Sequence, residues 1–233
     1  MTPLKLPISQ RLLTCAGFVR PGARVADVGT DHGYLGIYLL RQGIAAHVYA
    51  SDIREQPLEK ARANAARFGT AEHMTFSLND GLAALRPGEA DTVVCAGMGA
   101  DCIVGILEAA PWVRNGDVRL ILQPQSSGQT LRRWLPEQGF TILRETLLEE
   151  NRFLYTVLEA RWNGENTIPT PGRQFVTPQL LASGSPLLGR YLGRLIRSME
   201  QTVLGLRQGA DDPERLSYYE TALAELREME RSL

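Results

Sequence analysis

Two carboxylates and an imidazole lie around a glycine turn in the stretch VADVGTDHGYLGIYLL, residues 25–40. A strand, a glycine turn and a helix in this order hold dinucleotides when the turn reads G-x-G-x-x-G, because the glycines let a pyrophosphate approach the backbone. Here the pattern is D-x-G-x-D-x-G, and Asp31 stands where it would repel a pyrophosphate. We therefore expect a cofactor with a positive centre, such as an aminoacyl sulfonium, beside Asp27 and Asp31.

Three further polar loops follow the next three strand-like segments. SDIRE places Asp52 where a carboxylate accepts hydrogen bonds from ribose hydroxyls, although the same acid is also suited to cap the next helix. LNDGL carries Asn79-Asp80-Gly81, which suits the reading of an adenine edge but is also a common turn. AGMGA carries Met98, which we expect to form a wall of the cofactor pocket. Since ligands of parallel sheets bind at the carboxyl ends of the strands, the four loops together predict one site.

The fourth loop argues against one kind of chemistry. Enzymes that methylate exocyclic amines of bases usually carry an Asn/Asp-Pro-Pro-aromatic sequence at this place, whereas this chain has Ala96-Gly97-Met98-Gly99. The nearest substitute, QPQ at 123–125, is expected after the fifth strand and lacks the aromatic residue. A ring nitrogen such as adenine N1 has a free lone pair and no proton to lose before attack. Positioning and electrostatics would then supply most of the catalysis.

Alternating strands and helices must position these loops. Strands are predicted at 23–29, 47–52, 74–80, 91–99 and 118–124, and helices at 8–19, 34–43, 55–69, 102–110 and 129–139. Two strand-like segments, 140–150 and 152–162, then follow each other with only a short break. This order predicts an α/β fold: a Rossmann-like, mostly parallel sheet with helices on both faces and an antiparallel hairpin at its edge.

The end of the chain differs in composition. Residues 163–178 are rich in proline and glycine and predict a linker between a sheet domain, 1–162, and a small helical domain, 179–233. Apolar residues at spacings of three and four predict two amphipathic helices there, which would form an antiparallel, coiled-coil-like hairpin. Between them, GADDP offers Asp211 or Asp212 as the cap of the second helix.

The first of these two helices also carries a row of arginines. Arg190, Arg194 and Arg197 are spaced so that they share one face, opposite the apolar stripe. Two interpretations stay open for this row: an ordinary solvated face, or a ridge that binds RNA phosphates.

Composition restricts the class of protein further. Among 233 residues, 44% are apolar and 22% charged, which is ordinary for a globular chain. The net charge of −1 means that any binding to nucleic acid must use a local patch. Three cysteines without a C-x-x-C pair and three scattered histidines predict neither a disulfide framework nor a metal site. No segment has the length of a membrane span, so we expect a cytoplasmic protein with no membrane partner.

The sheet domain resembles the bacterial tRNA (adenine-22-N1)-methyltransferases, which are class I enzymes that depend on S-adenosylmethionine. The resemblance rests on SQRL near the N-terminus, ADVGTDHGYL, LNDGLAAL with a nearby PGEAD, AGMG, LILQP, LRRWL and EENRFLYTVLEA, between about residues 9 and 162. That family also has a C-terminal helical domain. This chain departs from it in having AGMGA for AGMGG and QPQ for QPN.

The resemblance implies a cofactor, a substrate and the residues that bind them. It implies S-adenosylmethionine as methyl donor, N1 of an adenine at position 22 of tRNA as acceptor, and extrusion of that adenine from the RNA. The implied cofactor-binding positions are Asp27, Gly29, Thr30, Asp31, Gly33, Tyr34, Asp52, Ile53, Asn79, Asp80, Gly81, Ala96, Gly97 and Met98. The implied catalytic positions are Asp31, His32 and Arg11, and Arg11 is also a candidate to bind RNA. Arg190, Arg194 and Arg197 are further candidates for RNA binding because of their spacing, not because of the resemblance.

Other interpretations stay open for some of these residues and for the whole chain. His32 could face solvent at the start of its helix, and Arg11 could lie on the wet face of an amphipathic one. The protein could instead methylate another RNA site or a small molecule, or it could be a non-catalytic RNA-binding module that has kept a cofactor pocket. The partner that we expect first is tRNA, and we expect a monomer or a weak dimer.

Overall fold

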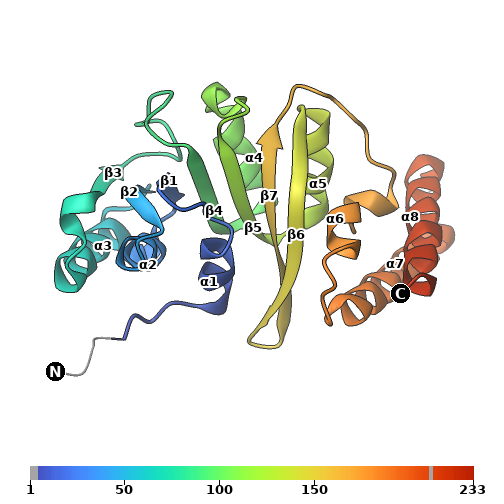
Figure 1. The fold of residues 1–233 in the computed structure, drawn as a ribbon. Coiled ribbons are helices and arrows are strands. Elements are labelled where there is room, and N and C mark those ends of the chain that lie inside the picture. Colours follow the sequence, from blue (N-terminus) through green and yellow to red (C-terminus); the bar gives the residue numbers. More distant parts are fainter. Residues whose placement is uncertain (1–4, 210–211) are drawn as a thin grey trace.

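The computed structural model describes residues 5–209 and 212–233, and a single seven-stranded sheet forms its centre (Figure 1). Its strands are β1 (Ala23–Val28), β2 (Ala45–Asp52), β3 (Met74–Leu78), β4 (Thr92–Gly99), β5 (Arg119–Ser126), β6 (Phe140–Glu150) and β7 (Phe153–Trp162). Their order is β3-β2-β1-β4-β5-β7-β6, in which neighbours from β3 to β5 are parallel and β7 is antiparallel to β5 and β6. The predicted Rossmann-like sheet with an antiparallel edge hairpin is confirmed.

Helices cover both faces of the sheet. Successive side chains of a strand point to opposite faces, so a buried strand needs an apolar layer on each side. One face packs against α1 (Gln10–Ala16), α2 (Tyr34–Arg41) and α3 (Glu55–Phe68), and the other against α4 (Ala100–Glu108) and α5 (Gly128–Glu137). In β1, Val25 contributes to the first core, whereas Ala26 and Val28 contribute to the second. The helices therefore leave the strand ends, rather than the faces, for the site.

Strand β4 ends at Gly99, as predicted, while β5 continues to Ser126, two residues beyond its predicted end. The AGMG and QPQ segments lie within these strands and pair with each other. Ala96 is opposite Gln123, Met98 is opposite Pro124, and the register shifts between them. Gly97 takes φ +80° at this irregularity, which is why a glycine is needed there.

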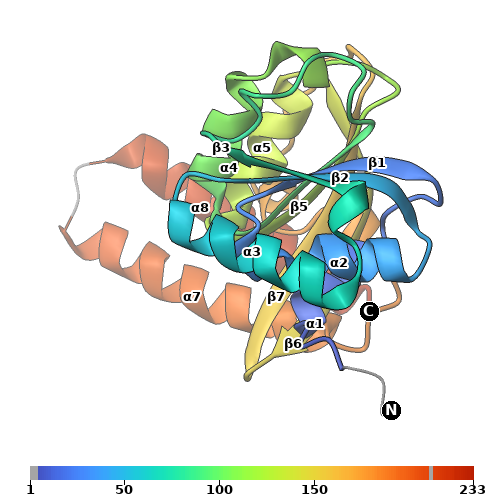
Figure 2. The ribbon, with the colours of Figure 1, turned by 90° about the vertical axis from the view of Figure 1, so that its left-hand side faces the viewer.

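The C-terminal segment forms a third apolar core beside β6 (Figures 1 and 2). It consists of α6 (Pro178–Leu181), α7 (Leu188–Gly209) and α8 (Pro213–Arg231), and Figure 2 shows α7 and α8 running side by side along the edge of the molecule. Asp212 caps α8 by accepting a hydrogen bond from the Arg215 amide at 3.0 Å, while Asp211 lies outside the described residues. The predicted helical hairpin is confirmed.

The hairpin is attached to the sheet rather than free-standing, because Leu147 of β6 belongs to the same core as α7 and α8. Within α7, Ile196 is buried and Leu195 is only partly covered. The segment 163–178 contains a short 3₁₀ turn, Gly172–Gln174, and buries Val176 and Thr177 against the rest of the protein. The boundaries of separate domains stay a prediction.

A buried ion pair joins the helical segment to the sheet. Arg132 of α5 contacts Glu145 of β6 at 2.5 Å, and both side chains are almost fully buried. Thr177, which caps α6, donates a hydrogen bond to the second Glu145 oxygen at 2.7 Å, and Arg132 also donates to Thr156 of β7 at 3.1 Å. Each charged group is thus satisfied by more than one partner, as buried charges must be.

Candidate active site

A cavity of about 730 Å³ opens at the carboxyl ends of β1, β2, β3 and β4. It lies where the strand order reverses between β1 and β4, the usual ligand site of such sheets. The predicted positions that line it are Arg11, Asp27, Gly29, Thr30, Asp31, His32, Tyr34, Asp52, Ile53, Asn79, Asp80, Gly81, Ala96, Gly97 and Met98. The structure therefore brings the four predicted loops to one place, together with Arg11 of α1.

The turn after β1 is fastened to β2 by backbone hydrogen bonds. The amides of Gly29 and Thr30 both donate to the Ser51 carbonyl, at 2.8 and 2.9 Å. Gly29 takes φ +71°, and a side chain there would overlap the methyl group of Met98. Both the conformation and the close approach of Met98 require glycine at this position.

Asp27 lies beneath this turn and is 5% exposed. Its carboxylate accepts a hydrogen bond of 2.7 Å from the Thr30 hydroxyl. Burial raises the pKa of Asp27 to about 6, although the Thr30 hydrogen bond lowers it in part. The carboxyl therefore changes charge close to neutral pH, which makes it sensitive to any cation that enters the cavity.

His32 and Asp31 project from the turn towards solvent and the cavity mouth. His32 takes φ +63°, and the Asn64 side chain holds this conformation by donating to the His32 carbonyl at 2.9 Å. The His32 Nε2 atom lies 3.5 Å from the Asp31 carboxylate, and its ring lies parallel to that of Tyr34, with centroids 5.4 Å apart. The turn thus presents a carboxylate beside a pair of stacked rings.

The loops after β2 and β3 supply acceptors on the opposite side. Asp52 is 6% exposed and accepts a hydrogen bond from the Arg54 amide at 2.9 Å. Helix α3 begins after Arg54 without a side-chain cap, so the capping role that the sequence offered for Asp52 as an alternative is not found. The Oδ1 atom of Asn79 is buried and has no hydrogen-bond partner within the described structure. A buried acceptor without a partner is costly, and a ligand that donates to it would remove this cost.

Arg11 reaches the cavity from α1, a helix that begins at its cap Ser9. Its Nε donates to Glu150 of β6 at 2.6 Å, and its guanidinium lies 5.0 Å from the centre of the Tyr155 ring of β7. Although partial burial raises the pKa of Glu150, hydrogen bonds from Arg11 outweigh it and lower that pKa below its usual range. The charged pair therefore persists at neutral pH.

Glu150 and Tyr155 were not predicted as site residues. Their only signal in the sequence was their place in EENRFLYTVLEA, which says nothing of which helix they meet. Gln123 was singled out within QPQ but without this role: it is fully buried, and its Oε1 accepts from the Gly97 amide at 3.1 Å. The remaining lining residues that the sequence did not indicate include Pro7, Leu12, Arg54, Cys102 and Ile106.

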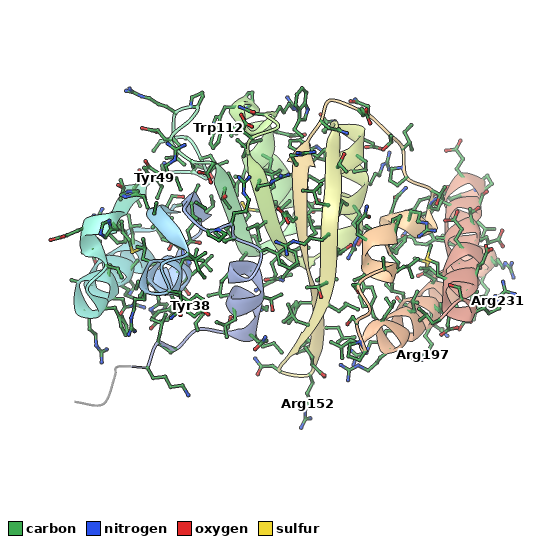
Figure 3. All side chains as sticks on the ribbon, in the orientation of Figure 1. Tyr38, Tyr49, Trp112, Arg152, Arg197 and Arg231 are labelled. Carbon is green, nitrogen blue, oxygen red and sulfur yellow. The ribbon has the colours of Figure 1, made fainter. Side chains whose placement is uncertain are left out.

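Two groups of predicted residues lie outside the cavity. Gly33 takes φ +69° and packs against α3, where a side chain would approach Ala61 within 3.1 Å, so its contribution is to the close packing of the turn. Arg190 pairs with Glu149 of β6 at 2.7 Å, which places the start of α7 beside the strand that ends at Glu150. Arg194 and Arg197 are exposed further along α7. Arg197 is labelled in Figure 3.

The described ranges show two further properties of the molecule. Nowhere in them do three His, Cys, Asp or Glu side chains gather as they would around a metal ion. None of the helices in those ranges combines the length and the apolar content that crossing a membrane requires.

Comparison with known proteins relates this cavity to one family. Residues 8–158 match the methyltransferase domain family. The tRNA (adenine(22)-N(1))-methyltransferase of Bacillus subtilis is 36% identical over 156 residues, which cover 67% of this chain and 66% of that enzyme. A provisionally assigned tRNA methyltransferase of Mycoplasma pneumoniae is 31% identical over 82% of this chain and 90% of its own length.

Solved structures extend the similarity to the whole chain. The crystal structure of the B. subtilis enzyme, 29% identical, superposes with a TM-score of 0.86 over 97% of this chain and all of that one. A Streptococcus pneumoniae protein crystallised with S-adenosyl-L-methionine, also 29% identical, superposes with a TM-score of 0.80 over 96% of this chain and 99% of its own. The likeness therefore includes the C-terminal helices as well as the sheet.

Proposed function

This chain belongs to the family of tRNA (adenine-22-N1)-methyltransferases, class I enzymes that use S-adenosylmethionine, and we propose that it methylates N1 of an adenine in tRNA, at position 22. The observation that carries the proposal is the single cavity in which four strand-end loops meet Arg11. One half of its lining, with Asp27, Asp52 and Asn79, suits the methyl donor. The other half, with His32 and Tyr34, suits a base.

The donor half fits S-adenosylmethionine by the chemistry of its groups. The buried, unpaired Oδ1 of Asn79 is an acceptor that an adenine amine would satisfy. Asp52 keeps carboxylate oxygens at the end of β2, where ribose hydroxyls can donate to them. Asp27 and Asp31 bring negative charge to the turn between them, which favours a cationic sulfonium over a pyrophosphate. When bound, S-adenosylmethionine supplies an electrophilic methyl group.

The other half is suited to position a base rather than to remove a proton. Adenine N1 attacks with its own lone pair, so the reaction needs alignment of the two partners and stabilisation of charge. The stacked rings of His32 and Tyr34 offer an aromatic surface beside the turn, and we assign them to holding the adenine. Asp31 lies next to His32 and is suited to stabilise the positive charge that methylation leaves on the ring.

Arg11 is suited to hold RNA at the mouth of the cavity. Glu150 and Tyr155 fix its guanidinium on one side, which leaves its other donors for a phosphate. A base inside a helical stack cannot reach the donor, so the adenine must leave the stack, and an anchored neighbouring phosphate would keep it extruded. Arg190, Arg194 and Arg197 would extend this contact along α7.

The test measures both the donor and the product. Purified protein is incubated with labelled S-adenosylmethionine and bulk tRNA, and the tRNA is digested to nucleosides. We expect labelled 1-methyladenosine, and sequencing of the product should place it at position 22. Label in another nucleoside, or only in ribosomal RNA or metabolites, would show a different substrate, while absence of donor binding in calorimetry would contradict the enzymatic function itself.

Two further proposals accompany this function. We infer that the protein works in the cytoplasm, where tRNA is modified, and that it acts as a monomer or a weak dimer. Sedimentation with and without tRNA tests the second statement directly.

A further inference from the structure

The hairpin between β6 and β7 ends in an unusual turn. Asn151 and Arg152 both take left-handed conformations, with φ of +51° and +68°, as the two central residues of a type I′ turn do. Asparagine tolerates this conformation, but arginine rarely adopts it, and glycine is the usual residue there. Figure 3 shows Arg152 at the tip of the hairpin, with its side chain pointing away from the fold. The turn therefore presents the Arg152 guanidinium to solvent.

The residue after this turn is an exposed aromatic. Phe153 is 64% exposed although it begins strand β7, where it pairs with Glu150. Among the apolar side chains of the described residues that are large and exposed, Phe153 is the aromatic one; the others are Ile53, Leu78, Leu143, Ile168, Leu204 and Leu233. An exposed phenyl ring buries little apolar surface and so adds little to the stability of the fold, which suggests that Phe153 has another role.

Phe153 continues a row of side chains that starts at the cavity. Its ring centre lies 6.4 Å from that of Tyr155, which is on the same face of β7 two residues later. Tyr155 lies 5.0 Å beneath the guanidinium of Arg11, and Arg11 lines the cavity. We call these three side chains, Arg11, Tyr155 and Phe153, the hairpin platform. It leads without interruption from the cavity mouth to the hairpin tip.

The chemistry of the platform favours one class of partner. A surface that docks another protein combines several apolar side chains in one patch. Here one exposed aromatic ring, Phe153, follows Arg152 of the turn in the sequence and pairs with Glu150 across the hairpin, and its neighbour Tyr155 contacts Arg11. Aromatic rings interleaved with cations are how proteins bind unstacked nucleotides, with the rings against bases and the arginines near phosphates.

We propose that the hairpin platform, together with Arg152 of the turn, binds the nucleotide next to the target adenine, with its base stacked on Phe153 and its phosphate at Arg152. This inference rests on the proposed function, since it assumes that an adenine is extruded into the cavity. Extrusion leaves the neighbouring base without a stacking partner, and Phe153 replaces that partner. The hairpin would thereby stabilise the opened RNA, while the residues of the cavity perform the reaction.

The first experiment compares kinetic constants of Phe153→Ala, Phe153→Trp and wild type with tRNA as substrate. We expect Phe153→Ala to raise KM for tRNA roughly fivefold to fiftyfold, with unchanged affinity for S-adenosylmethionine. Phe153→Trp should stay close to wild type, because tryptophan keeps the stacking surface. The matched control is Ile168→Ala, which shortens an apolar side chain that is 84% exposed in the segment 163–178.

The second experiment locates the contact. A tRNA with 5-iodouridine on either side of the target adenine is irradiated with the enzyme, and the cross-linked peptide is identified by mass spectrometry. We expect a cross-link at Phe153 for one of the two positions. A wild-type enzyme without activity on tRNA would contradict the proposed function, whereas an active enzyme whose KM does not change in Phe153→Ala would contradict only the platform. A change of oligomeric state in that variant, with KM unchanged, would assign Phe153 to a protein contact instead.

Discussion

The two walls of the cavity are built in different ways. The side that we propose for the methyl donor, here the donor wall, consists of turns that immediately follow their strands, so that Gly29, Thr30 and Asp52 are placed by hydrogen bonds near them in the sheet. The side that we propose for RNA, here the RNA wall, depends on Arg11, whose partner Glu150 is 139 residues away in the sequence. A local motif therefore determines one wall, and tertiary packing determines the other.

This difference has a functional consequence. The donor is the same molecule in every reaction cycle, and a rigid set of turns is suited to it. An RNA must be opened and held in a particular shape, and side chains carried on α1, the β6–β7 hairpin and α7 can be altered without disturbing the turns. Changes in the donor wall should therefore abolish activity, while changes in the RNA wall should weaken the binding of tRNA.

The largest effect is expected from Asp31→Ala in the donor wall. Loss of this carboxylate removes the charge that favours a sulfonium at the turn, and we expect methyl transfer to tRNA to fall below detection. Label incorporated into tRNA under saturating donor measures it. Glu59→Ala on the exposed side of α3 is the control and should keep full activity. An active Asp31→Ala enzyme would remove Asp31 from the site.

The next effect concerns the connection between the sheet and the C-terminal helices. Glu145→Ala leaves the buried Arg132 guanidinium without its carboxylate, and we expect the free energy of unfolding to fall by about 3–5 kcal/mol. Urea denaturation measures the change. The control is Glu200→Ala, which removes an exposed pair with Arg227 and should cost less than about 1 kcal/mol. The double variant Arg132→Met, Glu145→Leu should recover most of the loss, and failure to do so would show that the network has another role.

The sequence predicted which residues of the donor wall meet at one cavity, because that information is local. Strand periodicity and the glycine turns place Asp27, Asp52 and Asn79 at adjacent strand ends, and no knowledge of distant contacts is needed. The same reasoning ended β5 at residue 124, whereas β5 continues to Ser126 because Ser126 pairs with Gly99 of β4 after a register shift.

The RNA wall could not be predicted to the same extent. SQRL and EENRFLYTV are recognisable as motifs, but periodicity does not show that α1 meets the end of β6. In the same way the arginines of α7 were seen as one face of a helix, while the contact of Arg190 with Glu149 of β6 depends on the packing of a separate core. Contacts of this kind come from topology, which a single sequence specifies only indirectly.

The third prediction concerns how ionisation of the buried Asp27 lowers the stability of the folded protein. Because burial raises the pKa of Asp27 from 3.8 to about 6, the folded protein holds this proton more tightly than the unfolded chain. The protonated Asp27 carboxyl contributes about 3 kcal/mol to the free energy of unfolding below pH 4. This contribution is lost as the pH rises through the pKa of the folded state, at about 6. Asp27→Asn should abolish this part of the pH dependence in denaturation measured without the donor. Parallel curves for variant and wild type would contradict the raised pKa.

The smallest effect is expected on α7, where the RNA wall is most exposed. Replacing Arg190, Arg194 and Arg197 with Ala should weaken binding of tRNA roughly tenfold and reduce the slope of log affinity against log salt by about 2, because fewer counterions are released. Donor affinity should not change. The matched control replaces three arginines of α8, Arg215, Arg227 and Arg231, which removes the same charge from the neighbouring helix. An equal loss of tRNA affinity in both variants would mean that net charge alone attracts the tRNA. An unchanged salt slope in the α7 variant would show that the three arginines form an ordinary solvated face.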